Sequence, residues 1–323
     1  MNTLTPDKAS VFLVTTLRKR LKAVRRRIPG VRKGRDIECV HDLRVALRRL
    51  RGALTVLAGF FPAHLVKRWR KPVRRLTRTM GAARDADVQI EFLKAFLKGT
   101  TDPRCRPGIE HLLLRATQRR EALQSKVLRE LERFEKAAVA GALDAALLRK
   151  QVRARSLPPR KLRRLACDCL TTLLEDMLAY ETQVMHPKRI AALHRMRIAA
   201  RRLRYAIEVF APLYPDALEA AHTLLTEIQD LLGDIHDCDL WIEFLPTFLE
   251  TEQARTRNHG GRSRAVNRLA PGLKLLAHER RQHRDTRYRE FIARWQKVKK
   301  QNFWKTFRRN LRPPKAATVA VGR

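Results

Sequence analysis

The chain of 323 residues carries 70 Lys and Arg against 32 Asp and Glu, which gives a formal net charge of +38 and a pI near 11.4. Charge of this sign favours a polyanionic partner, because unneutralised self-repulsion destabilises the compact state. The 44% of hydrophobic residues indicates a globular protein, and no apolar run reaches the roughly 18 residues of a membrane span, so no membrane partner is expected.

The cysteines indicate a reducing compartment. They are odd in number and form no C-x-x-C pair, and the N-terminus lacks the charged and apolar regions of a signal peptide. We therefore predict a cytoplasmic protein with no disulfide framework, whose free thiols are Cys39, Cys105, Cys167, Cys169 and Cys238.

Apolar residues recur at helical spacing along the chain, beginning with Phe12, Val14, Leu17, Leu21 and Val24. No segment alternates as a strand does, so we predict an all-α fold. The first half should contain an opening helix up to Pro29-Gly30, an Arg-rich helix from about 41 to 60, a third helix interrupted at Gly81, and a long closing helix. Further breaks fall at 61–62, 99–103, 158–159, 187, 214–215, 259–261 and 271–272.

The Arg-rich helix has two opposite stripes. Its apolar stripe, which should pack inward, consists of Leu43, Leu47, Leu50, Leu54 and Leu57. The first arginine stripe consists of His41, Arg44, Arg48 and Arg51. A solvated helix face usually mixes charges of both signs, whereas here neighbours one turn apart repel each other. The planar guanidinium group grips phosphate oxygens with two hydrogen bonds, so this stripe favours a phosphate ligand.

The chain then repeats itself. The motif around the first stripe returns 153 residues later, with a second arginine stripe of His194, Arg197, Arg201 and Arg204. The segment 80–88 returns as 232–240, with Gly233 in place of Gly81. We predict one domain over 5–308, made of two pseudo-symmetric four-helix bundles from 5–157 and 160–308 that enclose a basic central cavity. The core pattern ends at about Thr306, the basic segment 251–264 should be a mobile loop, and 309–323 should be a disordered tail.

Two features of the repeat leave alternatives open. His41 and His194 are either structural residues near a helix start or additional phosphate donors that strengthen as the pH falls. The repeated Gly-x-x-x-Asp-x-Asp motifs, with Asp85 and Asp237 leading, resemble metal-ligand pairs, but a metal site would need several convergent histidines. We interpret these aspartates as helix N-caps that also anchor arginines of the stripes.

The order of motifs resembles the CHAD family, the conserved histidine α-helical domain, over about residues 5–308. The resemblance rests on three motifs in order, which are His-x-x-Arg-Val-x-x-Arg-Arg-Leu-Arg, then Leu-Gly-x-x-x-Asp-x-Asp-Val, and then a second His-x-x-Arg-Ile-x-x-x-Arg-Leu-Arg-Tyr. It implies a helical domain that binds inorganic polyphosphate, associates with polyphosphate granules in the cytoplasm, and performs no catalysis. No cofactor and no metal are expected.

The predicted polyphosphate-binding residues combine both stripes with neighbouring arginines. They are His41, Arg44, Arg48, Arg49, Arg51, Arg74, Arg75, Arg78, His194, Arg197, Arg201, Arg202 and Arg204. The second half departs from the family pattern, because Thr226 replaces the usual lysine and His236 the usual asparagine. Its third helix is therefore expected to hold phosphate less tightly.

Other functions compete with this hypothesis. An enzyme acting on phosphates would need a phosphate loop or carboxylates that hold Mg²⁺, and the sequence shows neither arrangement. Nonspecific binding of duplex nucleic acid by backbone contacts stays available to any protein this basic. Single-strand binding is disfavoured, because only 6% of residues are aromatic and none interleaves with the stripes. Contact with granule-associated proteins is compatible with polyphosphate binding.

Overall fold

The structure, a computed structural model, describes residues 6–34, 37–137, 159–214, 216–258 and 266–311. Within these ranges the regular secondary structure is entirely helical and contains no β-strand. The predicted all-α class is therefore confirmed. No helix of the described ranges combines the length and the apolarity that a membrane crossing requires.

Each half of the chain runs through an opening, an Arg-rich, a third and a closing helix. In the first half these are α1 (Pro6–Lys33), α2 (Ile37–Val56), α3 (Ala63–Gly99) and α4 (Arg106–Lys136), with the short η1 (Ala58–Phe60) after α2. In the second half they are α6 (Pro159–Leu178), α8 (Ile190–Phe210), α9 (Glu219–Asn258) and α11 (Ala270–Lys300), with α7 (Glu181–Val184), η3 (Ala211–Leu213) and α12 (Phe303–Leu311) as additions.

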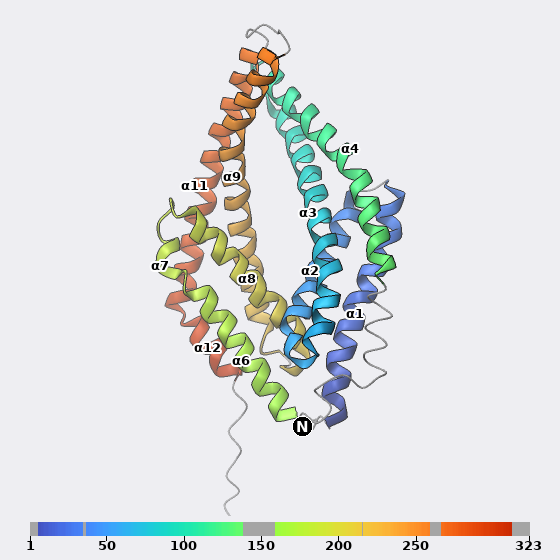
Figure 1. Ribbon diagram of the computed structural model, residues 1–323. Helices are drawn as coiled ribbons and strands as arrows, with labels where there is room; N and C mark the ends of the chain where they lie inside the picture. Colours follow the sequence, from blue (N-terminus) through green and yellow to red (C-terminus); the bar gives the residue numbers. More distant parts are fainter. Residues whose placement is uncertain (1–5, 35–36, 138–158, 215, 259–265, 312–323) are drawn as a thin grey trace, which may run out of the picture.

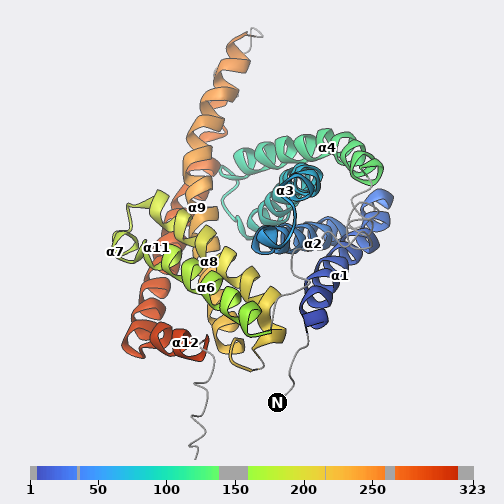
Figure 2. The same cartoon turned by 60° about the horizontal axis from the view of Figure 1, so that its bottom comes forward.

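Consecutive helices pack in pairs, and the two halves then meet at two places. In the first half α1 packs on α2, α2 on α3 and α3 on α4, and the second half pairs α6 with α8, α8 with α9 and α9 with α11. Figure 1 shows α3 with α4 and α9 with α11 as two long arms that converge at one end. At the other end α2 packs directly on α8 and α1 contacts α6, and Figure 2 shows this face from below.

One large core joins both halves, with buried side chains from Leu13 of α1 to Leu311 of α12. The predicted apolar stripe of α2 is confirmed, since all five of its leucines are buried. A second, smaller core lies where the arms converge. It contains Leu93, Ile109, Leu112, Ala116, Trp241, Leu245, Phe248, Leu273, Leu276 and Ala277.

We call the place where the two arms converge the apex. There α4 and α11 make a close backbone contact. Each of these helices begins with a Pro-Gly pair, and proline suits the first turn because its missing N–H would be unpaired there. A Cβ atom on Gly108 would clash with the carbonyl oxygen of Leu269, and one on Gly272 would clash with that of Cys105. The two glycines therefore allow the helix starts to touch.

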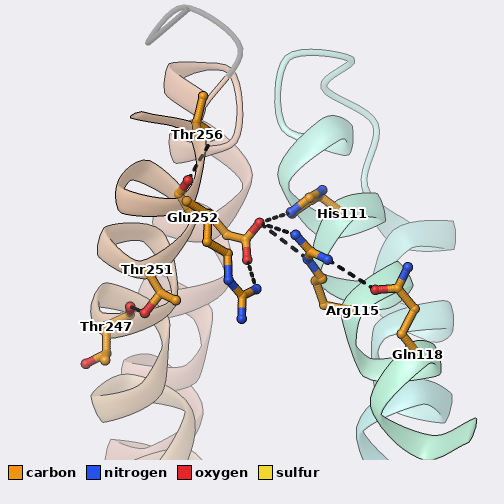
Figure 3. Close-up of polar contacts among 8 residues, drawn as sticks. His111, Arg115, Gln118, Thr247, Thr251, Glu252 and Thr256 are labelled. Carbon is orange, nitrogen blue, oxygen red and sulfur yellow. Dashed lines mark hydrogen bonds and ion pairs between the residues drawn. The ribbon is translucent and has the colours of Figure 1, made fainter. Parts of the chain in front are cut away.

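A buried carboxylate also ties the arms together at the apex (Figure 3). Glu252 of α9 is only 5% exposed. Its Oε2 lies 2.8 Å from His111 Nε2 and accepts a hydrogen bond of 2.8 Å from Arg115 Nη2, both on α4. Its Oε1 accepts a hydrogen bond of 2.7 Å from Arg255 Nη1 on its own helix. The second core and this ion cluster together join the two halves at the apex.

Several predicted helix boundaries are wrong. Pro29-Gly30 does not end the opening helix, which continues to Lys33 with Gly30 packed against the Cys39 thiol. The third helices are not interrupted, because α3 runs through Gly81 and α9 through Gly233. It follows that the aspartates after these glycines do not cap new helices.

The first parts of the predicted loop and of the predicted tail also differ from the prediction. Residues 251–258, expected in a mobile loop, form the end of α9. The core pattern does not end at Thr306, since α12 buries Trp304, Phe307 and Leu311 against the large core. The rest of the predicted tail, 312–323, and the rest of the loop, 259–265, lie outside the described residues, as does most of the segment before Pro159.

Candidate functional site

The packing of α2 on α8 brings the two arginine stripes together around one tyrosine. A Cβ atom on Gly52 of α2 would lie 3.0 Å from the Cβ of Tyr205 on α8, so the glycine lets the helices approach. The Tyr205 ring is buried, with the guanidinium carbons of Arg48 and Arg204 at 5.9 Å and 4.9 Å from its centroid. The expectation that no aromatic residue interleaves with the stripes is wrong at this position.

Five arginines from the two helices form what we call the arginine cluster. It consists of Arg44, Arg48 and Arg51 of α2 with Arg197 and Arg201 of α8. Burial and the charges of Arg48 and Arg197 lower the pKa of Arg201 to about 10. The pKa values of Arg44, Arg51 and Arg197 are lowered too, by burial first and by Arg48. All remain protonated at neutral pH, so the ligand-free protein holds repelling, partly desolvated charges together.

Most of the cluster lacks a carboxylate partner. Among the described residues, only Arg44 of the cluster forms an ion pair, with Asp85, whereas Arg48, Arg51, Arg197 and Arg201 form none. Arg48 Nε is also buried without a hydrogen-bond partner in this part of the chain. A buried donor without an acceptor is costly, and a bound anion would supply the missing acceptor.

Two other predicted site arginines pair with a carboxylate. Arg49 Nε lies 3.1 Å from Glu208 Oε2, and Arg204 Nη1 donates a hydrogen bond of 2.9 Å to Glu208 Oε1. Arg20 of α1 adds a third contact to the same carboxylate at 3.3 Å. Glu208 is the only acidic residue of α8, and these three arginines share its carboxylate.

The repeated glycines make room for arginines of the stripes. A Cβ atom on Gly81 of α3 would lie 4.0 Å from Arg44 Nε, and one on Gly233 of α9 would lie 3.8 Å from Arg197 Nε. One turn further on, Asp85 Oδ1 accepts a hydrogen bond of 3.3 Å from Arg44 Nη2. The prediction that the aspartates anchor stripe arginines is confirmed for this pair, although the glycine provides space and does not break the helix.

The second aspartate of each motif points to a different helix. Asp87 Oδ1 accepts a hydrogen bond of 2.6 Å from Arg120 Nε of α4. Asp239 pairs in the same way with Arg284 of α11. Because residues two apart on a helix are about 200° apart around its axis, one aspartate of each pair faces the cluster and the other holds the closing helix. In the described part of the chain, no group of three or more His, Cys, Asp or Glu side chains could hold a metal ion.

The histidine of the second stripe lies against His236, with their Nδ1 atoms 3.2 Å apart and one ring donating to the other. Burial and the charges of Arg197 and Arg201 lower the pKa of His194. Burial, Arg197, His194 and Arg201 lower the pKa of His236 to about 4. Both rings are therefore neutral near pH 7 and offer N–H donors without adding to the repulsion.

The remaining predicted residues lie around the cluster in different settings. Arg74, Arg78 and Arg202 are exposed, whereas Arg75 donates a hydrogen bond of 2.5 Å to the buried Glu130. His41 is half-buried on α2. Thr226 donates a hydrogen bond within α9 to the carbonyl of His222. A cavity of about 540 Å³ lies elsewhere, between α9, α11 and α12, and none of the cluster lines it.

Sequence reasoning missed two residues of the site. Tyr205 directly follows Arg204 and lies one turn after Arg201, and this position beside the second stripe was the available signal. Arg70 of α3 was not predicted, although its charge lowers the pKa of Arg51 and it donates a hydrogen bond of 3.3 Å to Thr55. Only the packing of α3 on α2 shows that Arg70 lies near Arg51.

Comparison with known proteins places this geometry in a family. A family model described as the CHAD domain matches residues 15–246. The crystal structure of the CHAD domain from the plant Ricinus communis is similar with a TM-score of 0.63 at 24% identity, covering 88% of this chain and 92% of that one. PptA from Streptomyces chartreusis is similar with a TM-score of 0.63 at 16% identity, covering 89% and 99%.

No curated protein matches the chain. The two solved structures, both under 25% identical, support the fold, and the family model covers well over half of the sequence. The chain therefore belongs to the CHAD domain family, a polyphosphate-binding family.

Proposed function

We propose that this protein binds inorganic polyphosphate at the arginine cluster and does not hydrolyse it. The observation that carries the proposal is the set of uncompensated arginines contributed by two helices, with Arg48 and Arg201 at its centre. Guanidinium groups bind phosphate oxygens through paired, charge-assisted hydrogen bonds. A linear chain of phosphates can neutralise several of these arginines at once, which a single small anion cannot do.

Binding without catalysis is the simpler use of this site. Phosphoryl transfer relies on carboxylates that hold Mg²⁺. The carboxylates nearest the cluster, Asp85 and Asp237, face arginines of the stripes. Incubation of the protein with long-chain polyphosphate and Mg²⁺ or Mn²⁺ should release no orthophosphate above the rate of a protein-free control, and release that depends on the protein would overturn this part of the proposal.

The sharpest test of the binding site compares two pairs of arginines with the same loss of charge. Arg48→Gln combined with Arg201→Gln should weaken the binding of long-chain polyphosphate about 100-fold at 150 mM salt, because each lost charge-assisted hydrogen bond contributes about 1.5–3 kcal/mol. The control combines Arg294→Gln with Arg308→Gln, which lie on α11 and α12 and form surface ion pairs.

Titration by fluorescence anisotropy measures both variants, and circular dichroism checks that they are folded. The control should change the affinity no more than about threefold, which is the effect expected from the loss of two positive charges away from the cluster. Equal losses in the two variants would show that binding follows net charge and not the cluster.

Nucleic-acid binding is the second candidate, and the same cluster separates it from polyphosphate binding. Tyr205 is only 8% exposed and lies beneath Arg48 and Arg204, so its ring offers no open face to a base. Duplex binding would have to use backbone contacts alone. We expect bound polyphosphate to persist when duplex DNA is added in tenfold excess of phosphate at 150 mM salt. Displacement by the DNA would favour the nucleic-acid function.

Polyphosphate granules in the cytoplasm are the proposed place of action. A fluorescent fusion of the wild-type chain should gather on granules in cells that accumulate polyphosphate. The Arg48→Gln, Arg201→Gln variant should stay diffuse in the same cells.

A further inference from the structure

The two aspartates of each Asp-x-Asp motif differ in burial as well as direction. Asp87 and Asp239, which hold the closing helices, are 3% and 8% exposed. Asp85, which faces the cluster, has a side chain that is 65% exposed. Its partner Arg44 is 26% exposed. The ion pair at the cluster is therefore solvated, whereas the ion pairs toward α4 and α11 are not.

The second half repeats the cluster-facing position. Asp237 lies one turn after Gly233, against which Arg197 packs. Among the charges around Arg197, that of Asp237 has the largest effect, and it favours the charged guanidinium. Asp85 and Asp234 act on Arg197 in the same direction, while Arg48 opposes them. Both stripes thus have a carboxylate near the same arginine position in the repeat.

Asp85 accepts a hydrogen bond from Arg44 that a phosphate oxygen can also accept, and Asp237 lies near Arg197 without forming an ion pair with it. A solvated ion pair contributes little to stability, because water and side-chain entropy offset the attraction. Paired hydrogen bonds from a guanidinium group to phosphate are stronger and are supported by the rest of the cluster. A phosphate chain can therefore replace the aspartates near Arg44 and Arg197. It must first overcome the attraction of the aspartates for these arginines and the repulsion between the aspartates and its own phosphates.

We infer that Asp85 and Asp237 are built-in competitors for Arg44 and Arg197, which attract these arginines in the ligand-free protein and lower its affinity for polyphosphate. The inference rests on the proposed function and adds that these two carboxylates limit the affinity for polyphosphate. The opposite role for these aspartates makes the opposite prediction. If the aspartates instead positioned the arginines for phosphate, their removal would weaken binding.

The direction of one change in affinity decides between these roles. Asp85→Asn combined with Asp237→Asn removes two negative charges and keeps the side-chain size. We expect polyphosphate to bind about tenfold more tightly, which corresponds to about 1.4 kcal/mol. The matched control is Glu175→Gln combined with Glu227→Gln, which removes two exposed carboxylates paired with Arg308 and Arg294. The control should change the affinity less than about threefold.

Affinity is measured by anisotropy with end-labelled long-chain polyphosphate at 150 mM salt, and thermal unfolding shows whether each variant is folded. Asp85→Asn alone, at the more exposed position, should tighten binding about threefold and serves if the double variant is unstable. An affinity of either folded variant that is unchanged or weaker would overturn the inference while leaving polyphosphate binding intact. Absence of binding by the wild-type protein would overturn the proposed function, and the inference with it.

Discussion

The two halves of the chain meet at two junctions with opposite electrostatics. At the apex, the single carboxylate of Glu252 is buried among His111, Arg115 and Arg255 and lies beside an apolar core. Where α2 packs on α8, arginines gather with few carboxylates near them. Arginine therefore stabilises the fold at one junction and remains available to a ligand at the other.

The pKa values express the same difference. Burial alone would raise the pKa of Glu252, but hydrogen bonds from Arg115 and His111 lower it to about 2, so the apex favours its charge. At the other junction burial and neighbouring arginines lower the pKa of Arg201 to about 10, so the surroundings there disfavour the charged guanidinium of Arg201. A binding site can be recognised by arginines whose charge the protein itself does not compensate.

The largest expected effect concerns the backbone contact at the apex. Gly108→Ala should lower the free energy of unfolding by about 3 kcal/mol, because the added methyl group would force the carbonyl of Leu269 away. Gly272→Ala should act in the same way. Gly99→Ala is the control, since no atom lies within 4 Å of the added Cβ there. Urea denaturation measures all three, and equal stabilities for Gly108→Ala and Gly99→Ala would refute the close contact.

Glu252→Gln should have the next largest effect, with a characteristic pH dependence. At pH 7 it should lower the free energy of unfolding by about 2 kcal/mol, because the partly exposed Arg and His donors around this buried position lose their charged partner. The folded pKa is lowered, so the contribution of Glu252 is fully present above pH 4.5 and is lost as the pH falls toward 2. The gap between wild type and variant should therefore narrow between pH 5 and pH 3 in urea titrations.

Polyphosphate affinity provides the contrast for that variant. Because Glu252 lies at the apex and contacts none of the cluster, Glu252→Gln should bind polyphosphate as the wild type does. A large loss of affinity in folded protein would mean that the two junctions are not independent.

His236 gives a smaller effect in a different pH window. Its folded pKa is about 4 against an ordinary value of 6.5, so the unfolded chain takes up the proton first as the pH falls. The stability contributed by the neutral ring is present above pH 6.5 and is lost between pH 6.5 and 4. His236→Asn should remove about 1 kcal/mol of this dependence, allowing for partial exposure. If the free energies of unfolding of variant and wild type changed in parallel over this pH window, the lowered pKa of His236 would be contradicted.

The smallest expected effect separates two neighbouring arginines. Arg49→Gln should weaken polyphosphate binding about twofold, because Arg49 already pairs with Glu208. Arg48→Gln should weaken it about tenfold, since Arg48 has no such partner among the described residues. Equal losses measured by anisotropy would show that compensation by Glu208 does not decide which arginines bind.

The sequence predicts the fold class and the pairing of the stripes because both follow from periodic patterns. The buried leucines of α2, from Leu43 to Leu57, repeat at helical spacing. The repeat of His41 and Arg44 at His194 and Arg197 led us to expect two similar helices that face each other, and α2 does pack on α8.

The errors arose where a residue serves packing instead of its usual local role. Gly81 was expected to break a helix, but it gives space to Arg44, which lies 37 residues earlier in the sequence. The ion cluster of His111 with Glu252 joins residues 141 positions apart and has no local signature. Phe307 and Leu311 were too few to form a recognisable stripe by themselves, and only their contact with the large core shows why α12 forms.

The single large core has a consequence for the origin of the repeat. Its side chains come from both halves, so one half alone would leave part of this apolar core in water. An ancestral chain with one copy of the repeat would have needed a second copy of itself to cover that surface. Such a homodimer would already have had one arginine stripe per subunit at its symmetry axis, and gene fusion would then have allowed the two stripes to diverge.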